Sequence, residues 1–194
     1  MKLPEKIYFV TGNAKKWEEV HAILGPYLPS LQQATLDLPE PQGSIHDIAL
    51  AKCRYAAQQL SAAVITEDTA LVFTEMNGMP GPYVKWFLEA LHVEGLARMA
   101  INYSGTDTPP AQAICTMAFC LGPEHEPVLF QGITDGVIVP PRGPLNFGWD
   151  PIFMPLPYSQ TYAEMPKDVK NAISHRSKAL DMLKAHFTQM QNNN

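Results

Sequence analysis

Hydrophobic and polar positions alternate in short runs that predict strands and helices in turn. The apolar run at residues 7–10 is typical of a buried strand, and the turn Thr11-Gly12-Asn13 ends it. Apolar residues then recur at helical spacing from Trp17 to Leu24, with Asn13 as the N-cap and Gly25-Pro26 as the stop. A strand, a glycine turn and a helix in this order predict an α/β opening unit.

The same reasoning predicts the rest of the chain, with more strands in the middle third. Helices are expected from the Ser44 cap to about residue 60, from around residue 85, and from 168 to 187, with a polar, disordered tail over 188–194. Neither an internal repeat nor a long linker is found, so one domain with two lobes is expected over residues 1–194. Strands are expected at 35–38, at 63–66 with Glu67-Asp68 at its end, at 113–121, and at 128–130 and 137–139 around a turn region at 132–136.

Composition and charge narrow the function classes. The 194 residues carry 14 Lys and Arg against 19 Asp and Glu, a formal charge of −5, and 46% are hydrophobic. This apolar content argues against disorder, and the scattered basic residues lack the footprint of a protein that binds a nucleic-acid polymer. No apolar run approaches the ~20 residues that span a bilayer, and the N-terminus lacks a signal peptide. A cytoplasmic protein without membrane contact is therefore expected.

The three cysteines, Cys53, Cys115 and Cys120, are an odd number without metal-ligand spacing. Cys115 and Cys120 lie five residues apart in one predicted strand, so their side chains would point to opposite faces. We expect all three to be reduced thiols in the core.

The turn Thr11-Gly12-Asn13-Ala14-Lys15-Lys16 is the first candidate site. It leads into a helix N-terminus, where backbone N–H groups and partial positive charge favour anions, and it adds two ammonium groups. A phosphate is the natural ligand, although the spacings of a P-loop and of GxGxxG are both absent. The alternative is an ordinary helix cap followed by two solvated lysines.

Three carboxylates form the second candidate site, Glu40 in a Pro/Gly loop and Glu67-Asp68 at the predicted strand end. Carboxylates at strand ends can hold Mg²⁺ together with substrate phosphates. A carboxylate beside such an ion can also orient or deprotonate a water. Solvated loop acids are the alternative interpretation.

Cationic and aromatic side chains form the third candidate site. A nucleotide base can stack on a ring such as Phe147 or Trp149, beside Asp150, for about 1–3 kcal/mol and be read by fixed donors. The alternatives are Trp149 as a core residue, His175 as a satisfied interior histidine, and the lysines as surface residues. The candidate donors are Lys52, Lys85, Lys170 and the cluster Ser174-His175-Arg176. An aromatic clamp with such donors, beside phosphate and Mg²⁺ sites, suits a nucleoside triphosphate.

Seven short motifs, in order and spacing, resemble the inosine triphosphate pyrophosphatase family in its eukaryotic type. The likeness spans roughly residues 7–187, almost the entire chain. The motifs are YFVTGNAKK (8–16), DLPE (37–40), TEDT (66–69), GPYVKWFL (81–88), FGWDP (147–151), TYAEM (161–165) and SHR (174–176).

The resemblance implies hydrolysis of non-standard purine nucleoside triphosphates, those of inosine, deoxyinosine and xanthosine, to the monophosphate and pyrophosphate. It implies Mg²⁺ as the cofactor, with Mn²⁺ as a substitute. It further implies an elongated α/β fold with a long mixed sheet flanked by helices, two lobes around a central nucleotide-binding cleft, and a homodimer.

Residue by residue, the resemblance assigns roles to the three candidate sites. The loop at residues 44–47 is less acidic than in relatives, so an outer metal contact from it would depend on Asp47. Thr11, Asn13 and Lys16 match the triphosphate-binding turn, with Gly12, Ala14 and Lys15 between them; Lys52 matches a phosphate-contacting lysine; Glu40 and Asp68 match metal-associated acids with Glu67 beside them. The base-recognition set is Phe147, Trp149, Asp150, Lys170, His175 and Arg176, and Lys85, Gly148 and Ser174 are counted with the substrate-binding residues.

The mechanism expected from these roles is attack of a water on the α-phosphorus, which expels pyrophosphate. Lys16 and Lys52 would hold the phosphates, and Asp68, together with Glu67, would position the water. Arg176 would read the 6-keto oxygen of the purine. Two alternatives stay open: a pyrophosphatase with another base preference, such as a pyrimidine triphosphate, and a non-catalytic nucleotide-binding protein.

Overall fold

The computed structural model describes residues 3–192, which form two compact units. Unit 1 combines residues 3–68, Cys115–Gly132 and residues 176–192, whereas unit 2 combines Thr69–Ile114 and Ile133–His175. Each unit is therefore assembled from segments that are distant in the sequence. The expected α/β class, with a mixed sheet flanked by helices, is confirmed.

One sheet carries all seven strands. β1 (Ile7–Val10) lies between β2 (Leu31–Ala34) and β3 (Ala63–Phe73) and is parallel to both, as the predicted α/β opening unit requires. The strand order continues from β3 to β5 (Pro110–Cys120), β6 (Val128–Ile138) and β7 (Phe153–Pro155), and β4 (Pro80–Gly81) pairs with β3 off this path.

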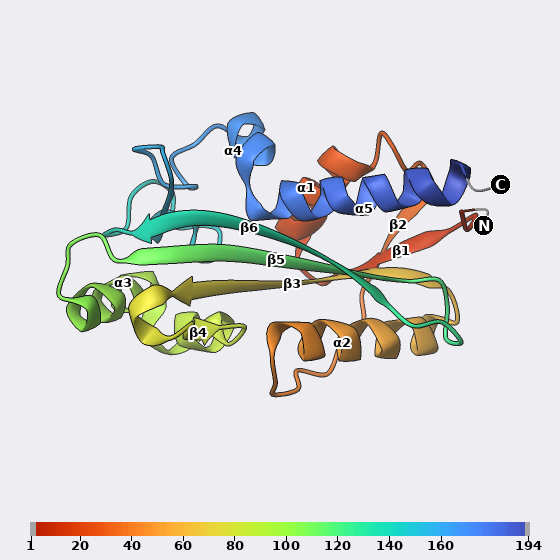
Figure 1. Cartoon of the computed structure of the whole chain (residues 1–194), viewed down its shortest axis with the longest axis horizontal. Coiled ribbons are helices and arrows are strands. Elements are labelled where there is room, and N and C mark those ends of the chain that lie inside the picture. Colours follow the sequence, from red (N-terminus) through yellow and green to blue (C-terminus); the bar gives the residue numbers. More distant parts are fainter. Residues whose placement is uncertain (1–2, 193–194) are drawn as a thin grey trace. The chain divides into compact units, whose positions relative to one another are not determined.

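Helices cover both faces of the sheet in unit 1. α1 (Ala14–Leu24) and α5 (His175–Asn192) share one apolar cluster with Ile65 and Cys115, whereas α2 (Ile45–Leu60) shares another with Val64 and Cys120. Figure 1 shows α5 and α2 on opposite sides of these strands. The cysteine prediction is confirmed, since all three thiols are free and buried and Cys115 and Cys120 lie in different clusters.

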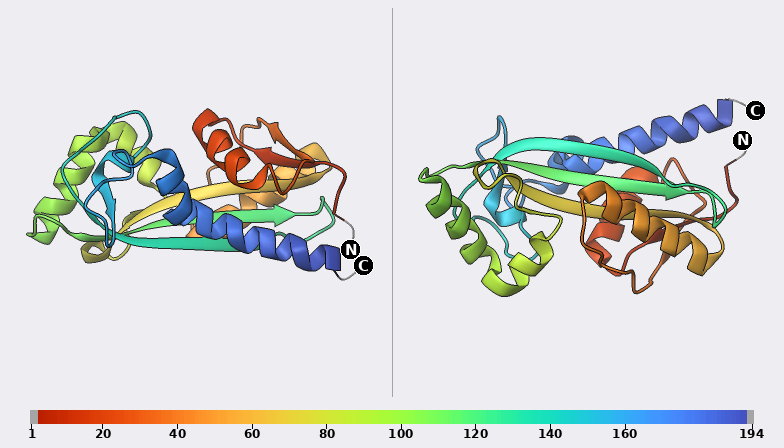
Figure 2. Two further views of the ribbon diagram at one scale, coloured as in Figure 1. Left: turned by 90° about the horizontal axis from the view of Figure 1, so that it is seen from above. Right: turned by 60° about the horizontal axis from the view of Figure 1, so that its bottom comes forward.

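Unit 2 has its own core, built on the remaining halves of β3, β5 and β6. Leu71, Phe73, Phe153 and Tyr162 pack in it against α3 (Val84–Ser104). α3 is broken at His92, whose φ of 55° is outside the helical range, and Figure 2 shows the two arms. The short helix α4 (Lys167–Ile173) and the loops before β7 and α4 complete the unit.

Three strand predictions are corrected. β2 lies at 31–34 rather than 35–38, because two exposed glutamines obscure its pattern. β3 continues through Glu67 and Asp68, so neither acid lies at a strand end. β6 is one strand from 128 to 138, and Gly136 serves packing rather than a turn, since a Cβ there would lie 2.5 Å from the Phe153 ring.

The C-terminal helix prediction is corrected as well. The expected helix over 168–187 is two helices, α4 and α5, separated by Ser174 in an extended conformation with ψ of 157°. α5 continues to Asn192, so residues 188–192 are helical rather than disordered, and 193–194 lie outside the described residues. The break places His175 and Arg176 in the first turn of α5.

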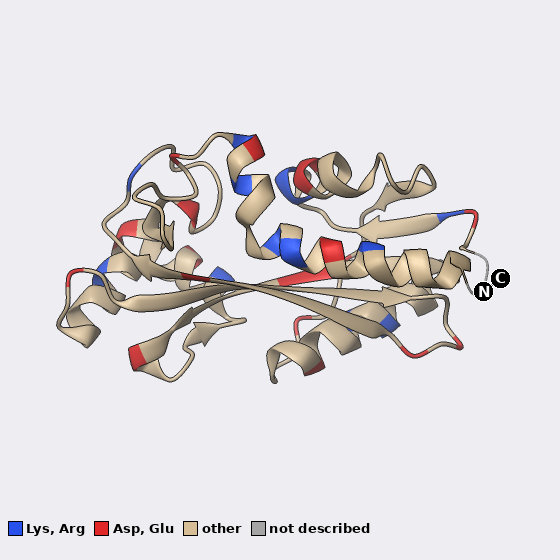
Figure 3. Cartoon of the chain, turned by 45° about the horizontal axis from the view of Figure 1, so that its top comes forward, with Lys and Arg blue, Asp and Glu red and all other residues tan. Residues whose placement is uncertain are grey.

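Over residues 3–192, no helix is both long and apolar enough to cross a bilayer. Figure 3 shows basic and acidic segments interspersed along the ribbon of α1, α4 and α5. This mixture agrees with the scattered charges of the sequence.

Candidate active site

The turn between β1 and α1 is a well-capped helix N-terminus. Asn13 Oδ1 accepts hydrogen bonds from the backbone N–H groups of Lys15 (3.0 Å) and Lys16 (3.1 Å), and Thr11 Oγ1 accepts one from Asn13 N–H (3.1 Å). These three N–H groups serve the cap, so attraction for an anion comes from the helix dipole and the two lysine ammonium groups. Gly12 and Ala14 are exposed in the same turn.

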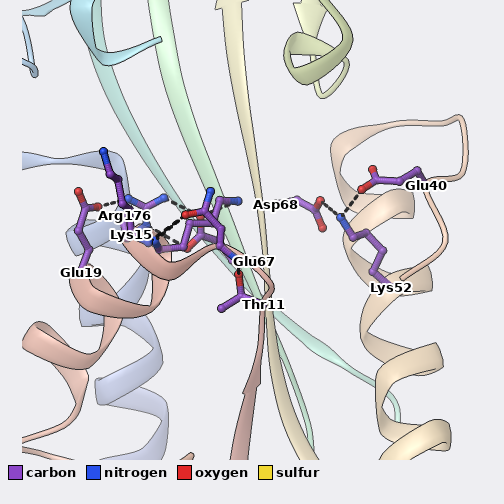
Figure 4. Close-up of polar contacts among 10 residues, drawn as sticks. Thr11, Lys15, Glu19, Glu40, Lys52, Glu67, Asp68 and Arg176 are labelled. Carbon is purple, nitrogen blue, oxygen red and sulfur yellow. Dashed lines mark hydrogen bonds and ion pairs between the residues drawn. The ribbon is translucent and has the colours of Figure 1, made fainter. Parts of the chain in front are cut away.

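Glu67 and Asp68 project to opposite faces of the sheet because they are consecutive residues in β3. Figure 4 shows Glu67 beside Arg176 and Asp68 on the other side, facing Lys52. The structure therefore separates the two adjacent acids into two clusters. We call Glu40, Lys52 and Asp68 the α2-side cluster, and Lys16, Glu19, Glu67 and Arg176 the α1-side cluster.

The α2-side cluster joins three predicted site residues. Lys52 Nζ donates to Asp68 Oδ1 at 2.6 Å and lies 3.6 Å from Glu40 Oε1. Lys52 and Asp68 have largely buried side chains, whereas that of Glu40 is 44% exposed. Asp68 Oδ2 is buried and has no hydrogen-bond partner among the described residues. An acceptor of this kind is costly to bury unless a ligand completes it.

The α1-side cluster is a more deeply buried ion-pair network. Arg176 binds Glu67 in a bidentate manner, Nε to Oε2 at 2.9 Å and Nη2 to Oε1 at 2.7 Å, and its Nη1 donates to Glu19. Lys16 Nζ lies 3.2 Å from Glu67 Oε1. Only 1% of the Glu67 side chain and 3% of the Arg176 side chain are exposed. The network thus orders cations from two helices around one strand carboxylate.

Electrostatics keeps both buried partners charged. Burial alone would raise the pKa of Glu67, but the adjacent Arg176 and Lys16 cations outweigh it and hold that pKa well below its usual range. Burial would likewise lower the pKa of Arg176, and the attraction of Glu67 raises it instead. Glu67 is therefore a permanent carboxylate at neutral pH.

In unit 2, two of the predicted base-recognition residues, Phe147 and Asp150, contact Lys170. Lys170 Nζ donates to Asp150 Oδ2 at 2.5 Å, and both side chains are buried. The same ammonium lies 4.6 Å from the Phe147 ring centroid and 5.5 Å from that of Tyr162. Tyr162 was not predicted as a site residue, although it belongs to the TYAEM motif. Together these residues form a cation–aromatic cluster.

Trp149 is a core residue, as the alternative interpretation proposed. It is 7% exposed and packs edge-on against Phe153 at 5.7 Å between ring centroids, and against His175 at 5.2 Å. His175 and Ser174 are buried, and Gly148 turns the loop with φ of 50°. Phe147 is only half-buried, so it is the more accessible flat face of this loop.

Lys85 is exposed at the start of α3, with Nζ 5.0 Å from the centroid of the neighbouring Trp86 ring.

Glu19 is a member of the α1-side cluster that the sequence reasoning missed. The signal was its spacing of three residues from Lys16, which places both side chains on one face of α1.

Comparison with known proteins assigns the chain to a family. Residues 7–186, nearly the whole described chain, match the Ham1 family. The chain belongs to the Ham1 family. The match includes every site residue discussed above, in both units.

Relatives of this Ham1 chain carry informative names. A protein of Tuber melanosporum named inosine triphosphate pyrophosphatase is 55% identical over 183 residues, covering 94% of this chain and 96% of its own. A protein of the same name from Puccinia graminis f. sp. tritici is 52% identical over 191 residues, covering 95% and 97%.

Solved structures agree with this assignment. The Staphylococcus aureus Ham1 protein superposes with a TM-score of 0.80 at 28% identity, covering 95% of this chain and all of that one. A Mycobacterium abscessus structure described as a nucleoside-triphosphatase and dITP/XTP pyrophosphatase superposes with a TM-score of 0.69 at 28% identity, covering 92% and 97%.

The Ham1 chain offers a divalent cation two carboxylates rather than a complete cage. Within the described part of the chain, no group of three or more His, Cys, Asp or Glu side chains is placed to hold a metal. Mg²⁺ usually binds through one or two carboxylates plus substrate phosphates. The buried, unpartnered Oδ2 of Asp68, a residue that shares Lys52 with Glu40, fits that requirement. Glu67 lies on the opposite face of the sheet from Asp68, and both of its carboxylate oxygens are in ion pairs. It therefore does not join Glu40 and Asp68 at this site.

Proposed function

We propose that this chain hydrolyses non-standard purine nucleoside triphosphates, those of inosine, deoxyinosine and xanthosine, to the monophosphate and pyrophosphate. The observation that carries the chemistry is the Asp68 carboxylate, with one oxygen fixed by Lys52 and the other buried without a partner. The names of the fungal relatives support the choice of substrate.

Lysines on two helices are assigned to the polyphosphate. Lys16 stands in the first turn of α1, where the helix dipole adds to its charge, and Lys52 stands in α2 beside Asp68. Ammonium groups bind phosphate oxygens as point charges and compensate the charge that develops as the bond to pyrophosphate breaks.

Glu40 and Asp68 are the residues we assign to Mg²⁺. The ion, when bound, neutralises phosphate charge and makes a nearby water easier to deprotonate. The Asp68 carboxylate accepts the proton of the attacking water, whose oxygen forms a bond to the α-phosphorus. The bond from that phosphorus to the bridging oxygen breaks, and pyrophosphate leaves with the electron pair. Lys52 orients Asp68 through its hydrogen bond to Oδ1.

The cation–aromatic cluster of unit 2 is assigned to the purine. The half-buried Phe147 ring offers a stacking face, and Lys170, held by Asp150, is a donor of fixed position. The 6-keto oxygen of hypoxanthine and xanthine accepts a hydrogen bond, whereas the 6-amino group of adenine does not. His175 belongs to the same proposal, whereas the guanidinium of Arg176, predicted to read the 6-keto oxygen, binds Glu67 and Glu19 through all three of its nitrogen atoms.

Hydrolysis of inosine triphosphate in ¹⁸O-labelled water tests the proposed chemistry. We expect one labelled oxygen in the nucleoside monophosphate and none in pyrophosphate, because water attacks the α-phosphorus. Label in pyrophosphate, or release of orthophosphate in place of pyrophosphate, would contradict the proposal.

We also propose that the protein is a homodimer. Large apolar side chains are exposed in unit 2 around the start of α3, among them Met79, Trp86 and Leu91. Exposed aromatic and methionine side chains near one another are typical of protein interfaces.

A further inference from the structure

The α1-side cluster contains two carboxylates as well as two cations, although only cations are needed to bind phosphate. Two cations, Lys16 and Arg176, face two carboxylates, Glu67 and Glu19, so the cluster is formally neutral. Its members come from the first helix, a central strand and the last helix of unit 1. Lys16 has the most exposed side chain of the four, at 21%, against 15% for Glu19 and 3% or less for Arg176 and Glu67.

Arg176 is the centre of this cluster. Its guanidinium donates from all three nitrogen atoms, two to Glu67 and one to Glu19. The planar fork of arginine matches a carboxylate in bidentate geometry, so Arg176 fixes the orientation of the Glu67 carboxylate. Glu67 Oε1 in turn lies 3.2 Å from Lys16 Nζ.

We propose that Glu19 and Arg176 are positioning residues, which orient Glu67 and through it hold the Lys16 ammonium in place for the phosphates. The proposal rests on the proposed function, since it gives Lys16 a phosphate to bind. Glu19 anchors the guanidinium from α1, Arg176 anchors the carboxylate from α5, and Glu67 anchors Lys16 from β3.

The need for such an arrangement follows from the side chain of lysine. A lysine has about 2 kcal/mol of rotamer entropy and a compact charge on a flexible stem, so an unrestrained Lys16 would sample many positions. Catalysis depends on charges already placed where the transition state needs them, and a displacement of about 1 Å can cost up to about 100-fold in rate. A buried carboxylate held by arginine supplies a rigid reference point.

Glu19 distinguishes a positioning role from direct phosphate binding. Because a carboxylate repels phosphate, a loss of activity on removing Glu19 cannot come from a lost phosphate contact. We expect Glu19→Ala to lower kcat for inosine triphosphate about tenfold and to change KM less than about threefold. The matched control is Glu18→Ala, the neighbouring and exposed carboxylate of α1, which should leave kcat within about twofold. Equal kcat values for the two variants would overturn the proposal.

A double-mutant cycle shows whether Glu19 acts through Lys16. In a Lys16→Ala background, Glu19→Ala should change the residual kcat less than about twofold, because the group to be positioned is gone. A full tenfold loss in that background would mean that Glu19 acts independently, and it would overturn the proposal. Should Glu19→Ala fail to fold, Glu19→Gln serves in the same cycle, with a kcat loss of about threefold since it keeps an acceptor oxygen.

A measurement without turnover distinguishes failure of this proposal from failure of the proposed function. In the ligand-free protein, ¹⁵N relaxation of Lys16 Nζ should report a restrained ammonium group, more mobile in Glu19→Ala and unchanged in Glu18→Ala. Equal mobility in all three proteins would overturn the positioning role. A wild type that releases no pyrophosphate would contradict only the proposed function.

Discussion

At the scale of single residues, strand geometry decides what two adjacent carboxylates can do. Glu67 and Asp68 follow each other in β3, so one meets Arg176 and Lys16 while the other meets Lys52 and has a buried free oxygen. The sequence predicts both as acids of one metal site. Their surroundings instead suit Glu67 to holding cations and Asp68 to the metal and the water.

The role of Asp68 gives a direct prediction. We expect Asp68→Asn to lower kcat about 100-fold or more while inosine triphosphate still binds, because a neutral amide cannot accept the water's proton or balance a divalent cation. Steady-state kinetics and calorimetric binding measure the two effects. The control Asp181→Asn, in an exposed ion pair with Lys184, should be as active as wild type. Turnover of Asp68→Asn within a few-fold of wild type would refute the assignment.

The buried thiols predict a dependence of stability on pH. Burial, reinforced by Cys120, raises the pKa of the Cys53 thiol to about 12. Since the unfolded thiol titrates near pH 8.5, deprotonation favours the unfolded chain, and the free energy of unfolding falls as pH rises from about 9 toward 12. Urea unfolding at pH 7.5 and pH 10 should show a larger loss for wild type than for Cys53→Ala. Equal losses would contradict the shift.

At the scale of elements, the helix caps were predicted and can be tested separately from the site. Ser44 Oγ accepts a hydrogen bond from Asp47 N–H at 3.2 Å and donates one to Asp47 Oδ2 at 2.7 Å, which caps α2. Removing such a cap costs about 1 kcal/mol, so Ser44→Ala should lower the unfolding free energy by that amount. Ser159→Ala, at an exposed loop position, is the control. No loss in Ser44→Ala would contradict the capping role.

The sequence predicts elements well where one face of a segment is regularly apolar, and fails where polar residues interrupt it. β1, α1 and α2 were predicted with their caps. β3 was predicted to stop at residue 66, because nothing near Glu67 and Asp68 in sequence shows that Arg176 and Lys52 compensate their charges. The sequence pattern over residues 168–187 is likewise continuous and helical, so it does not reveal the break at the extended Ser174.

At the scale of the whole molecule, the fold brings together residues that local reasoning treats separately. The resemblance predicts site roles for Glu40, Lys52 and Asp68, which come from separate segments and meet in the structure. It gave no sign of Glu19, which contacts Arg176, 157 residues away in the sequence. Such a contact follows from tertiary packing alone.

The proposed dimer is tested by mass in solution. Light scattering during size exclusion should give about twice the 21.5 kDa of one chain for wild type. Trp86, with 52% of its surface exposed, is the largest apolar side chain around the start of α3, so Trp86→Glu should shift the mass toward one chain. A wild type that stays at 21.5 kDa across a range of concentrations would contradict the proposal.

The central claim, a pyrophosphatase selective for 6-keto purines, is tested most directly by kcat/KM for a panel of nucleoside triphosphates with Mg²⁺ and pyrophosphate detection. We predict values for inosine and xanthosine triphosphates about 100-fold or more above that for ATP, with one pyrophosphate released per monophosphate. Equal values for ATP, a preference for pyrimidine triphosphates, or no turnover of any member would contradict the account.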